Sequence, residues 1–217
     1  MNKIKNLIID FGGVLIDLDR QKCVDNFAKL GLYEVKAMLD VYHQHGFFLQ
    51  HEKGLITSAD FRDGIRKSAD LDVSDEQIDA AWNSFLVGIP NNKLELLLAL
   101  RKNYNLYLLS NTNAIHWKWS CENAFLYDGY RVEDFFDKIY LSFELKMAKP
   151  DLDIFQYVLD DIKIDSSETL FIDDSADNCR VANTLGISTY APLACEDWSH
   201  LFDNGFLKDK LNATTSI

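Results

Sequence analysis

Short apolar runs alternate with longer amphipathic stretches along this chain of 217 residues. The first run, residues 7–9, ends at Asp10 and a Gly-Gly turn, which is typical of a buried strand. Later apolar runs predict further strands at residues 106–109, 138–141, 169–172 and 187–190. Apolar positions at helical spacing predict helices between them, at residues 94–100, 154–162 and 179–185. This alternation indicates an α/β fold, a Rossmann-like parallel sheet with helices on both faces.

A different pattern runs from about residue 20 to residue 88. It has almost no β-branched runs, and its apolar residues recur at helical spacing. Thr57 or Ser58 is a candidate N-cap, and Ser74 with Gln77 forms a capping-box pattern. Glycine, proline and paired asparagines at residues 88–92 predict a linker rather than a strand interior. We therefore expect a sheet domain of residues 1–19 and 89–217, with residues 20–88 inserted as a helical unit.

The composition narrows the classes of protein to which this chain can belong. Apolar residues make up 47% of it, which excludes a disordered chain, and the formal net charge of -12 makes nucleic acid an unfavourable partner. No apolar run approaches the roughly 18 residues that span a membrane, so we expect a cytoplasmic monomer or homodimer that binds no membrane. The cysteines lie far apart without CxxC spacing, which predicts buried thiols rather than zinc ligands or disulfides: Cys23, Cys121, Cys179 and Cys195.

Polar side chains stand where three of the predicted strands end. The three ends carry Asp10, the pair Ser110-Asn111 and the pair Asp173-Asp174. Because parallel strands place their carboxyl ends at one edge, the carboxylates of Asp10 and Asp174 would suit Mg²⁺ there. Ser110 and the N–H groups of the turn after it would hold a phosphate, and Lys149 would add positive charge. For Asp10 taken alone, a residue that only caps a turn is the open alternative.

These residues and their neighbours form motifs in a characteristic order. The motifs are Asp10-Phe11-Gly12-Gly13-Val14, Ser110-Asn111-Thr112-Asn113, Lys149-Pro150 and Phe171-Ile172-Asp173-Asp174-Ser175-Ala176-Asp177-Asn178. In this order, at strand ends, they resemble the haloacid dehalogenase-like (HAD) hydrolases, from about residue 3 to about residue 192. The resemblance implies a Mg²⁺-dependent phosphomonoester hydrolase of small metabolites. It also implies that the helical insert is the C1 cap, which covers the site and selects substrates.

The resemblance further implies a role for each motif residue. Asp10 would be the nucleophile that is transiently phosphorylated, and Lys149, the second catalytic residue, would bridge it to the phosphate. Ser110 and Asn111, together with Lys149, would bind the substrate. Mg²⁺ would be bound by Asp10, Asp174 and the main-chain carbonyl of Gly12.

Gly12 departs from the family's usual first motif. That motif has a second aspartate at this position, which protonates the leaving group and later activates water. Such acid-base help is worth about 10²- to 10⁴-fold, so we expect slow turnover of poor leaving groups unless another residue replaces it. Asp17, Asp19 and the side chains of the insert are the candidates, although an exposed helix start is the favoured interpretation of Asp17 and Asp19.

The aspartate pair 173–174 followed by Asn178 is similar to one subgroup of the family, whose glucose-1-phosphate phosphatases also resemble this chain in the glycine at position 12. This subgroup contains the bacterial α-glucose-1-phosphate phosphatases and the amino-terminal phosphatase domain of mammalian epoxide hydrolase, so glucose 1-phosphate is an expected substrate. Two alternatives stay open. One is a regulatory module that binds phosphate without turnover. The other is a dehalogenase, which needs no magnesium.

Several further side chains have weaker functional interpretations. His43, His45 and His51 cluster in the insert without zinc spacing, and one of them is expected to touch substrate. Trp117 and Trp119 are expected to pack in the core rather than to stack on a ligand. Asp177 is expected to support its loop and to hold Lys149. Residues 212–217 are expected to form a frayed tail.

Overall fold

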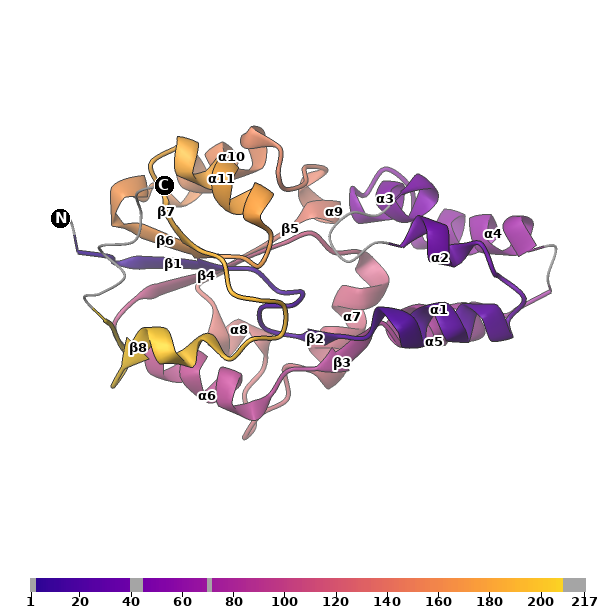
Figure 1. The fold of residues 1–217 in the computed structure, drawn as a ribbon, viewed down its shortest axis with the longest axis horizontal. Helices are drawn as coiled ribbons and strands as arrows, with labels where there is room; N and C mark the ends of the chain where they lie inside the picture. The colour runs from indigo at the N-terminus through magenta and orange to yellow at the C-terminus, as the bar shows by residue number, and fades with distance from the viewer. Residues whose placement is uncertain (1–2, 40–44, 70–71, 209–217) are drawn as a thin grey trace.

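A five-stranded sheet lies at the centre of the fold (Figure 1). The structure is a computed structural model that describes residues 3–39, 45–69 and 72–208. The strand order is β5-β4-β1-β6-β7, and every pair of neighbours is parallel. The strands are β1 (Asn6–Ile9), β4 (Asn105–Ser110), β5 (Lys138–Leu141), β6 (Thr169–Ile172) and β7 (Ser188–Tyr190). All the predicted strands are therefore present, whereas the predicted tail at 212–217 lies outside the described residues.

Side chains of the strands alternate between two apolar cores, which explains why the strands are apolar throughout. Leu7 and Ile9 of β1 belong to one core, and Ile8 between them belongs to the other. The core of Ile8 is completed by α10 (Leu152–Ile162) and α11 (Ala176–Thr184). The opposite face is covered by α6 (Asn91–Leu100) and α8 (Val132–Phe135) (Figure 1). The fold is thus the three-layered α/β architecture that the alternation predicts.

Further helices and a hairpin complete the sheet domain. They are α7 (Ala114–Asn123), α9 (Ser142–Leu145), the 3₁₀ helices at Ser166–Glu168 and Trp198–Leu201, and the hairpin of β8 (Phe202–Asp203) and β9 (Phe206–Leu207). Among the described residues, none of the helices has the length and apolar character needed to cross a membrane.

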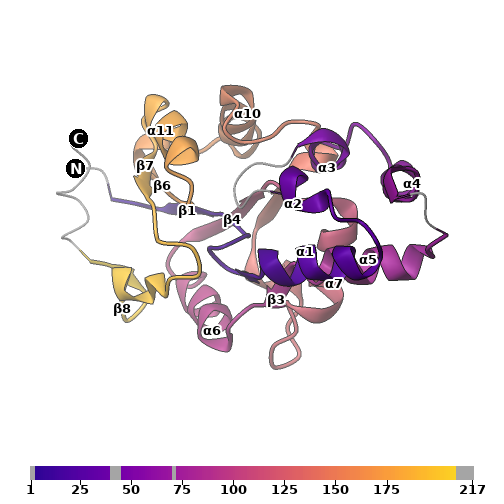
Figure 2. The ribbon, with the colours of Figure 1, turned by 45° about the vertical axis from the view of Figure 1, so that its right-hand side comes forward.

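The inserted segment forms a group of helices beside the end of the sheet at which β1 and β4 finish (Figures 1 and 2). The helices are α1 (Arg20–Lys29), α2 (Val35–Met38), α3 (Gly46–Glu52), α4 (Ser58–Ala69) and α5 (Asp75–Asn83). Ser74 and Gln77 form the predicted capping box at the start of α5, and Thr57 Oγ1 accepts from Asp60 N–H before α4.

Two short antiparallel strands connect the insert to the sheet domain. They are β2 (Asp17–Leu18) and β3 (Leu86–Gly88). The prediction of a linker from Gly88 onwards was wrong at its first residue, because Gly88 still pairs with Asp17 across this ribbon. The two crossings of the chain are thus held side by side.

Aromatic residues form the core of the insert. The rings of Phe27, Phe48, Phe61 and Trp82 pack with centroid separations of 5.0 to 6.3 Å. Trp82 also stacks on His116 of α7, at 4.1 Å between centroids, so this core continues into the sheet domain. Such aromatic pairs contribute about 0.5–1.5 kcal/mol each beyond their buried area.

The cysteines are all free thiols, as the sequence indicates, but they are not all buried. Cys23 and Cys179 are buried, Cys121 is half-buried and Cys195 is exposed. Cys195 follows β7 in a loop with a φ of 65°, and its N–H donates to the carbonyl of Gly13 at 2.6 Å. Cys195 is exposed because it lies in this loop, and the spacing of the cysteines in the sequence does not reveal that position.

Candidate active site

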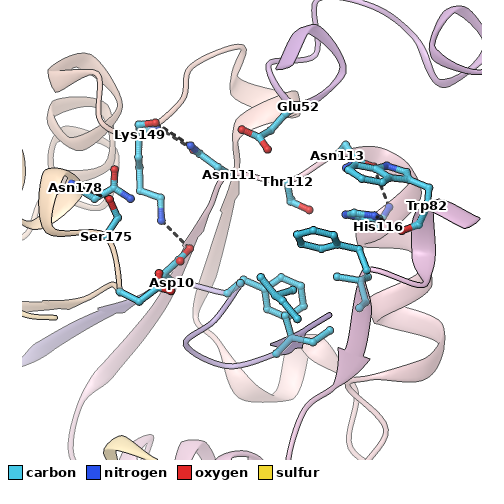
Figure 3. Close-up of a pocket in the computed structure, with 17 residues that line it drawn as sticks. Asp10, Glu52, Trp82, Asn111, Thr112, Asn113, His116, Lys149, Ser175 and Asn178 are labelled. Atoms are coloured by element: carbon cyan, nitrogen blue, oxygen red, sulfur yellow. Dashed lines mark hydrogen bonds and ion pairs between the residues drawn. The ribbon is translucent and has the colours of Figure 1, made fainter. Parts of the chain in front are cut away.

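A cavity of about 90 Å³ lies at the carboxyl ends of β1, β4 and β6 (Figure 3). Its sheet-domain wall is polar and includes Asp10, Lys149 and Asp174. Much of its apolar wall comes from the carboxyl-terminal end of the insert, from Trp82, Phe85 and Leu86. Asp10, Asn111 and Asp174, which the strand ends were predicted to bring together, therefore do meet here, beside the insert.

Lys149 is the charged centre of the cavity. Its Nζ lies 2.7 Å from Asp10 Oδ1 and 2.6 Å from Asp173 Oδ2, and it donates to the carbonyl of Leu109 at 2.8 Å. Burial alone would lower the pKa of Lys149, but the carboxylates of Asp10 and Asp173 outweigh it and raise that pKa above its usual value. Lys149 is therefore a fixed, permanently charged ammonium in contact with Asp10.

Asn111 holds the main chain of Lys149. Its side-chain amide donates to the carbonyl of Lys149 at 2.8 Å, and its Oδ1 accepts from the N–H of Lys149 at 2.9 Å. Asn111 lines the cavity, as a substrate-binding residue would, but both ends of its amide are engaged by Lys149. The geometry thus indicates that Asn111 positions Lys149.

Asp173 is fully buried and holds the ammonium from the other side. Asn178 Nδ2 donates to both of its carboxylate oxygens at 3.0 Å, and the N–H of Ser175 donates to its Oδ1 at 2.8 Å. Asp177 was expected in this role. It pairs instead with Arg180 at 2.5 Å, and its side chain is 55% exposed. The reason is helical geometry, since α11 turns residue 177 outward while Asn178 faces the cavity.

Carboxylate oxygens of Asp10, Asp173 and Asp174 all lie within 4.8 Å of one another. Burial raises the pKa of Asp10; the charge of Lys149 opposes this shift, and the charges of Asp173 and Asp174 add to it. Burial and the charge of Asp173 likewise raise the pKa of Asp174, to about 6. Several ionised carboxylates this close together in a buried site repel one another and lose hydration, which is unfavourable unless a cation binds them. Hard oxygen donors of this kind suit Mg²⁺, so the residues present fit the metal that the sequence predicts.

Ser110 and Thr112 follow β4 at the same edge. Ser110 is buried, and its hydroxyl has no hydrogen-bond partner among the described residues, but it does not line the cavity. Thr112 lines the cavity, yet its N–H donates to Ser142 Oγ at 2.9 Å and so is not free for a phosphate, contrary to expectation. An unsatisfied buried hydroxyl is costly, and a ligand oxygen that reached Ser110 would relieve that cost.

The candidate histidines of the insert do not line the cavity where the structure describes them. His51 is buried beneath Phe61 and bonded to Ser58 Oγ at 3.1 Å, His45 is exposed, and His43 lies outside the described residues. Hydrophobic spacing could not separate these positions, because helical register decides which of them faces inward.

Asp17 and Asp19 also lie outside the wall of the cavity. Asp19 caps α1 by accepting from Lys22 N–H at 2.9 Å, as a residue at the start of that helix would. Asp17 instead lies half-buried in β2, with Oδ1 at 3.5 Å from Lys93 Nζ, so it is not part of an exposed helix start. Trp117 and Trp119 are partly buried and pack against the core, Trp117 in edge contact with Phe11, so both are packing residues as expected.

Two polar residues of the cavity were missed by the sequence analysis. One is His116 of α7, whose Nε2 lies 3.1 Å from the carbonyl of Trp82. The other is Glu52, the last residue of α3. Nothing in their sequence context distinguishes them from surface residues. The only signal in the sequence was the absence of an aspartate at position 12, because it implied that another residue supplies the acid-base group.

Comparisons with known proteins agree with one another. A model of the haloacid dehalogenase-like hydrolase family matches residues 4–186. A D-ribitol-5-phosphate phosphatase of Bacteroides thetaiotaomicron is 40% identical over 195 residues, which cover 90% of this chain and 95% of that protein.

Solved structures give the same result. A HAD-family enzyme of B. thetaiotaomicron in complex with magnesium and inorganic phosphate superposes with a TM-score of 0.88 at 62% identity, covering 92% of this chain and 100% of that one. A predicted HAD-like hydrolase of Porphyromonas gingivalis superposes with a TM-score of 0.85 at 35% identity, covering 91% of this chain and 95% of that one.

Proposed function

Because the chain belongs to the haloacid dehalogenase-like hydrolases, we propose that it hydrolyses the phosphate ester of a small acyclic polyol through a phosphorylated Asp10. It is a Mg²⁺-dependent phosphatase of a small phosphorylated metabolite. The contact that carries the proposal is the 2.7 Å ion pair between Asp10 Oδ1 and Lys149 Nζ at the base of the cavity. It holds a carboxylate and a permanent positive charge where a phosphate would enter.

The proposed mechanism uses residues already in place. One oxygen of Asp10 attacks phosphorus, the new Asp10–phosphorus bond forms, and the ester bond to the polyol oxygen breaks. Water then cleaves the acyl phosphate, which releases inorganic phosphate and restores Asp10. Lys149 stabilises the phosphoryl oxygens throughout, with Asp173 and Asn111 fixing its position. The hydroxyl of Ser110, which does not line the cavity, would join them once a phosphoryl oxygen reached it. Mg²⁺, held by Asp10, Asp174 and the main-chain carbonyl of Gly12, would supply further charge neutralisation.

A polyol phosphate is favoured over a cyclic sugar phosphate by the similarity of the chain to one relative. The relative that matches 90% of the chain at 40% identity is a ribitol-5-phosphate phosphatase. Glucose 1-phosphate, the substrate implied by the sequence resemblance, is the contrasting candidate.

We propose that residues 20–88 act as the cap. The supporting observation is that they supply one wall of the cavity while the sheet domain, residues 1–19 and 89–217, supplies the charged groups. The ribbon of β2 and β3 is the natural hinge for opening, since it contains both crossings of the chain. Substrate selection then belongs to the cap, and phosphate and metal binding belong to the sheet domain.

A panel of phosphate esters tests this function. Phosphate release is measured with Mg²⁺ and with a chelator, for ribitol 5-phosphate, other alditol phosphates, ribose 5-phosphate and glucose 1-phosphate. We expect kcat/KM for the acyclic esters to exceed that for glucose 1-phosphate by at least about tenfold. The reverse order would assign the chain to sugar 1-phosphates. No release from any ester, p-nitrophenyl phosphate included, would support the regulatory alternative.

A further inference from the structure

Glu52 is a carboxylate of the cap that faces the catalytic groups of the sheet domain. It is the last residue of α3, it lines the cavity, and it lies on the wall opposite Asp10 (Figure 3). Its carboxylate has no hydrogen bond or ion pair to any residue that the structure describes. A carboxylate that enters a site without a partner is available to a ligand or to a proton.

The main chain around Glu52 is fixed to the sheet domain. The carbonyl of Glu52 lies 2.7 Å from Ser142 Oγ, and that hydroxyl also accepts from Thr112 N–H at the end of β4. Two residues later, Gly54 has a φ of 62°, and a β-carbon there would come within 2.0 Å of the carbonyl of Phe143. Only glycine permits this approach, so the end of α3 packs directly on α9. Glu52 therefore belongs to the cap but is held in place by the sheet domain.

The chemistry of the site requires a proton donor that the first motif does not supply. A polyol leaves as an alkoxide, which is a poor leaving group, and Gly12 has no side chain to protonate it. Asp10 and Lys149 are committed to the phosphoryl group and Asp174 to the metal. Burial lowers the pKa of His116 to about 3, so its imidazole is neutral, and the Nε2–H of that ring is engaged by the carbonyl of Trp82. Of the titratable residues that line the cavity, Glu52 remains.

We propose that Glu52 is the general acid that protonates the leaving oxygen and then the general base that activates water. The inference rests on the proposed function and names the residue that replaces the aspartate absent at Gly12. In-line attack by Asp10 places the leaving oxygen on the far side of phosphorus, which is the side of the cap wall that carries Glu52.

The proton balance is simple. As the Asp10–phosphorus bond forms and the phosphorus–polyol bond breaks, the leaving oxygen takes the proton of the Glu52 carboxyl group, so the polyol departs as an alcohol. In the second step water attacks phosphorus from the same side, and the Glu52 carboxylate takes its proton. The bond to Asp10 then breaks, phosphate leaves, and Glu52 is protonated for the next cycle.

The electrostatics around Glu52 suit both steps. Burial raises its pKa to about 7, opposed by the charges of Lys149 and Lys53, of which Lys53 is paired with Asp151 at 3.4 Å. The helices packed against α3 are α4 and α9, and neither presents a charged side chain to the cavity. Catalytic acids and bases work best with a pKa near the operating pH.

The test compares Glu52→Gln with the unmodified protein in pre-steady-state cleavage of two esters, with each ester in excess over the protein. One is an alkyl phosphate that the protein hydrolyses. The other is p-nitrophenyl phosphate, whose leaving group departs as a stable anion without a proton. We expect the rate of alkyl ester cleavage to fall by about 10²- to 10⁴-fold. The initial burst of nitrophenolate should keep its rate within a few-fold, because this leaving group needs no proton. The steady phase that follows should be slow, because hydrolysis of the phosphorylated Asp10 has lost its general base. The alkaline limb in the pH profile of kcat/KM for the alkyl ester should also disappear.

Glu144→Gln, which removes an exposed carboxylate of α9 outside the cavity, is the matched control, and melting temperatures verify folding. Equal losses on both esters, or a raised KM with unchanged kcat, would overturn the acid-base role. So would an unmodified protein that cleaves only aryl and anomeric phosphates. If polyol phosphates fail but another alkyl phosphate is cleaved, the polyol assignment alone is wrong, and Glu52 is tested on that ester.

Discussion

Gly13 and Asp174 are so close that only the absence of a side chain at position 13 lets both residues occupy their places. A β-carbon at Gly13 would come within 2.4 Å of Asp174 Oδ2, and the residue has a φ of 74°. The turn after the proposed nucleophile therefore packs against a proposed metal ligand. This contact couples the shape of the first turn to the position of the carboxylate that follows β6.

Gly13→Ala should consequently weaken Mg²⁺ binding as well as the fold. The positive φ alone costs an alanine about 1–2 kcal/mol, and the clash must in addition displace Asp174. Gly129→Ala is the matched control, because Gly129 has a φ of 83° but nothing within 4 Å of a β-carbon. We expect both variants to melt at lower temperature in chelator, and only Gly13→Ala to lose the rise in melting temperature on adding Mg²⁺. An unchanged Mg²⁺ response would show that Asp174 is not held by this contact.

Asp10→Asn should abolish turnover without unfolding the protein. The amide keeps the shape of the side chain but cannot attack phosphorus, and it removes one of several buried negative charges. Lys149 keeps its second partner, Asp173, at 2.6 Å. We therefore expect phosphate release at background and a metal-free melting temperature at pH 8 that is equal or higher. Turnover comparable to that of the unmodified protein would exclude the phosphorylated Asp10.

Asn111→Ala tests whether this residue acts through Lys149. It removes both hydrogen bonds to the Lys149 main chain, so we expect a loss of about 1–3 kcal/mol in stability and a fall in kcat larger than the rise in KM. The control is Asn183→Ala, which removes an exposed amide bonded to Thr189 Oγ1. A selective rise in KM would instead make Asn111 a direct substrate ligand.

His116→Gln should make the protein more tolerant of acid. Burial lowers the pKa of His116 to about 3 in the folded state, whereas an unfolded histidine titrates near 6.5. Between these values the unfolded chain binds a proton that the folded chain does not. Through this residue, the free energy of unfolding therefore decreases by about 1.4 kcal/mol for each unit by which the pH is lowered. Glutamine keeps a donor toward the carbonyl of Trp82 but does not titrate. In the presence of a chelator, we expect the unfolding free energy of the variant, relative to that of the unmodified protein, to increase as the pH is lowered from 6 to 4.5.

His200→Gln removes an exposed imidazole and is the matched control for that comparison. Both variants and the unmodified protein are unfolded in urea at each pH. Parallel curves of unfolding free energy against pH for His116→Gln and the unmodified protein would contradict the burial argument.

Gly12→Asp in the Glu52→Gln background should restore part of the lost alkyl phosphate cleavage. Gly12 does not have a positive φ, and a β-carbon there meets only Leu18 Cδ1 at 3.4 Å, so the turn accepts a side chain. The aspartate would stand two residues after the nucleophile, where the family usually has its acid. A plot of rate against leaving-group pKa should be steep for Glu52→Gln and flatter for the double variant. Equal slopes would show that position 12 cannot deliver a proton to this leaving group.

The sequence by itself determined the sheet and the residues at its carboxyl edge. An apolar run that ends at a carboxylate is readable because strand and turn propensities act within a few residues, and parallel strands bring such ends together whatever the details of packing. Asp10, Lys149 and Asp174 were therefore found from local patterns and their order along the chain. The helical insert was readable for the same reason, down to the capping box of Ser74 and Gln77.

Only the tertiary structure decided which other side chains reach the cavity. Asn178 rather than Asp177 supports the aspartate that holds Lys149, and Glu52 rather than His51 lines the cavity, because one step along a helix turns a side chain by about 100°. The position of Glu52 depends on a hydrogen bond to Ser142, 90 residues further along the chain. Contacts over such separations depend on how whole elements pack, and no local pattern in the sequence records them.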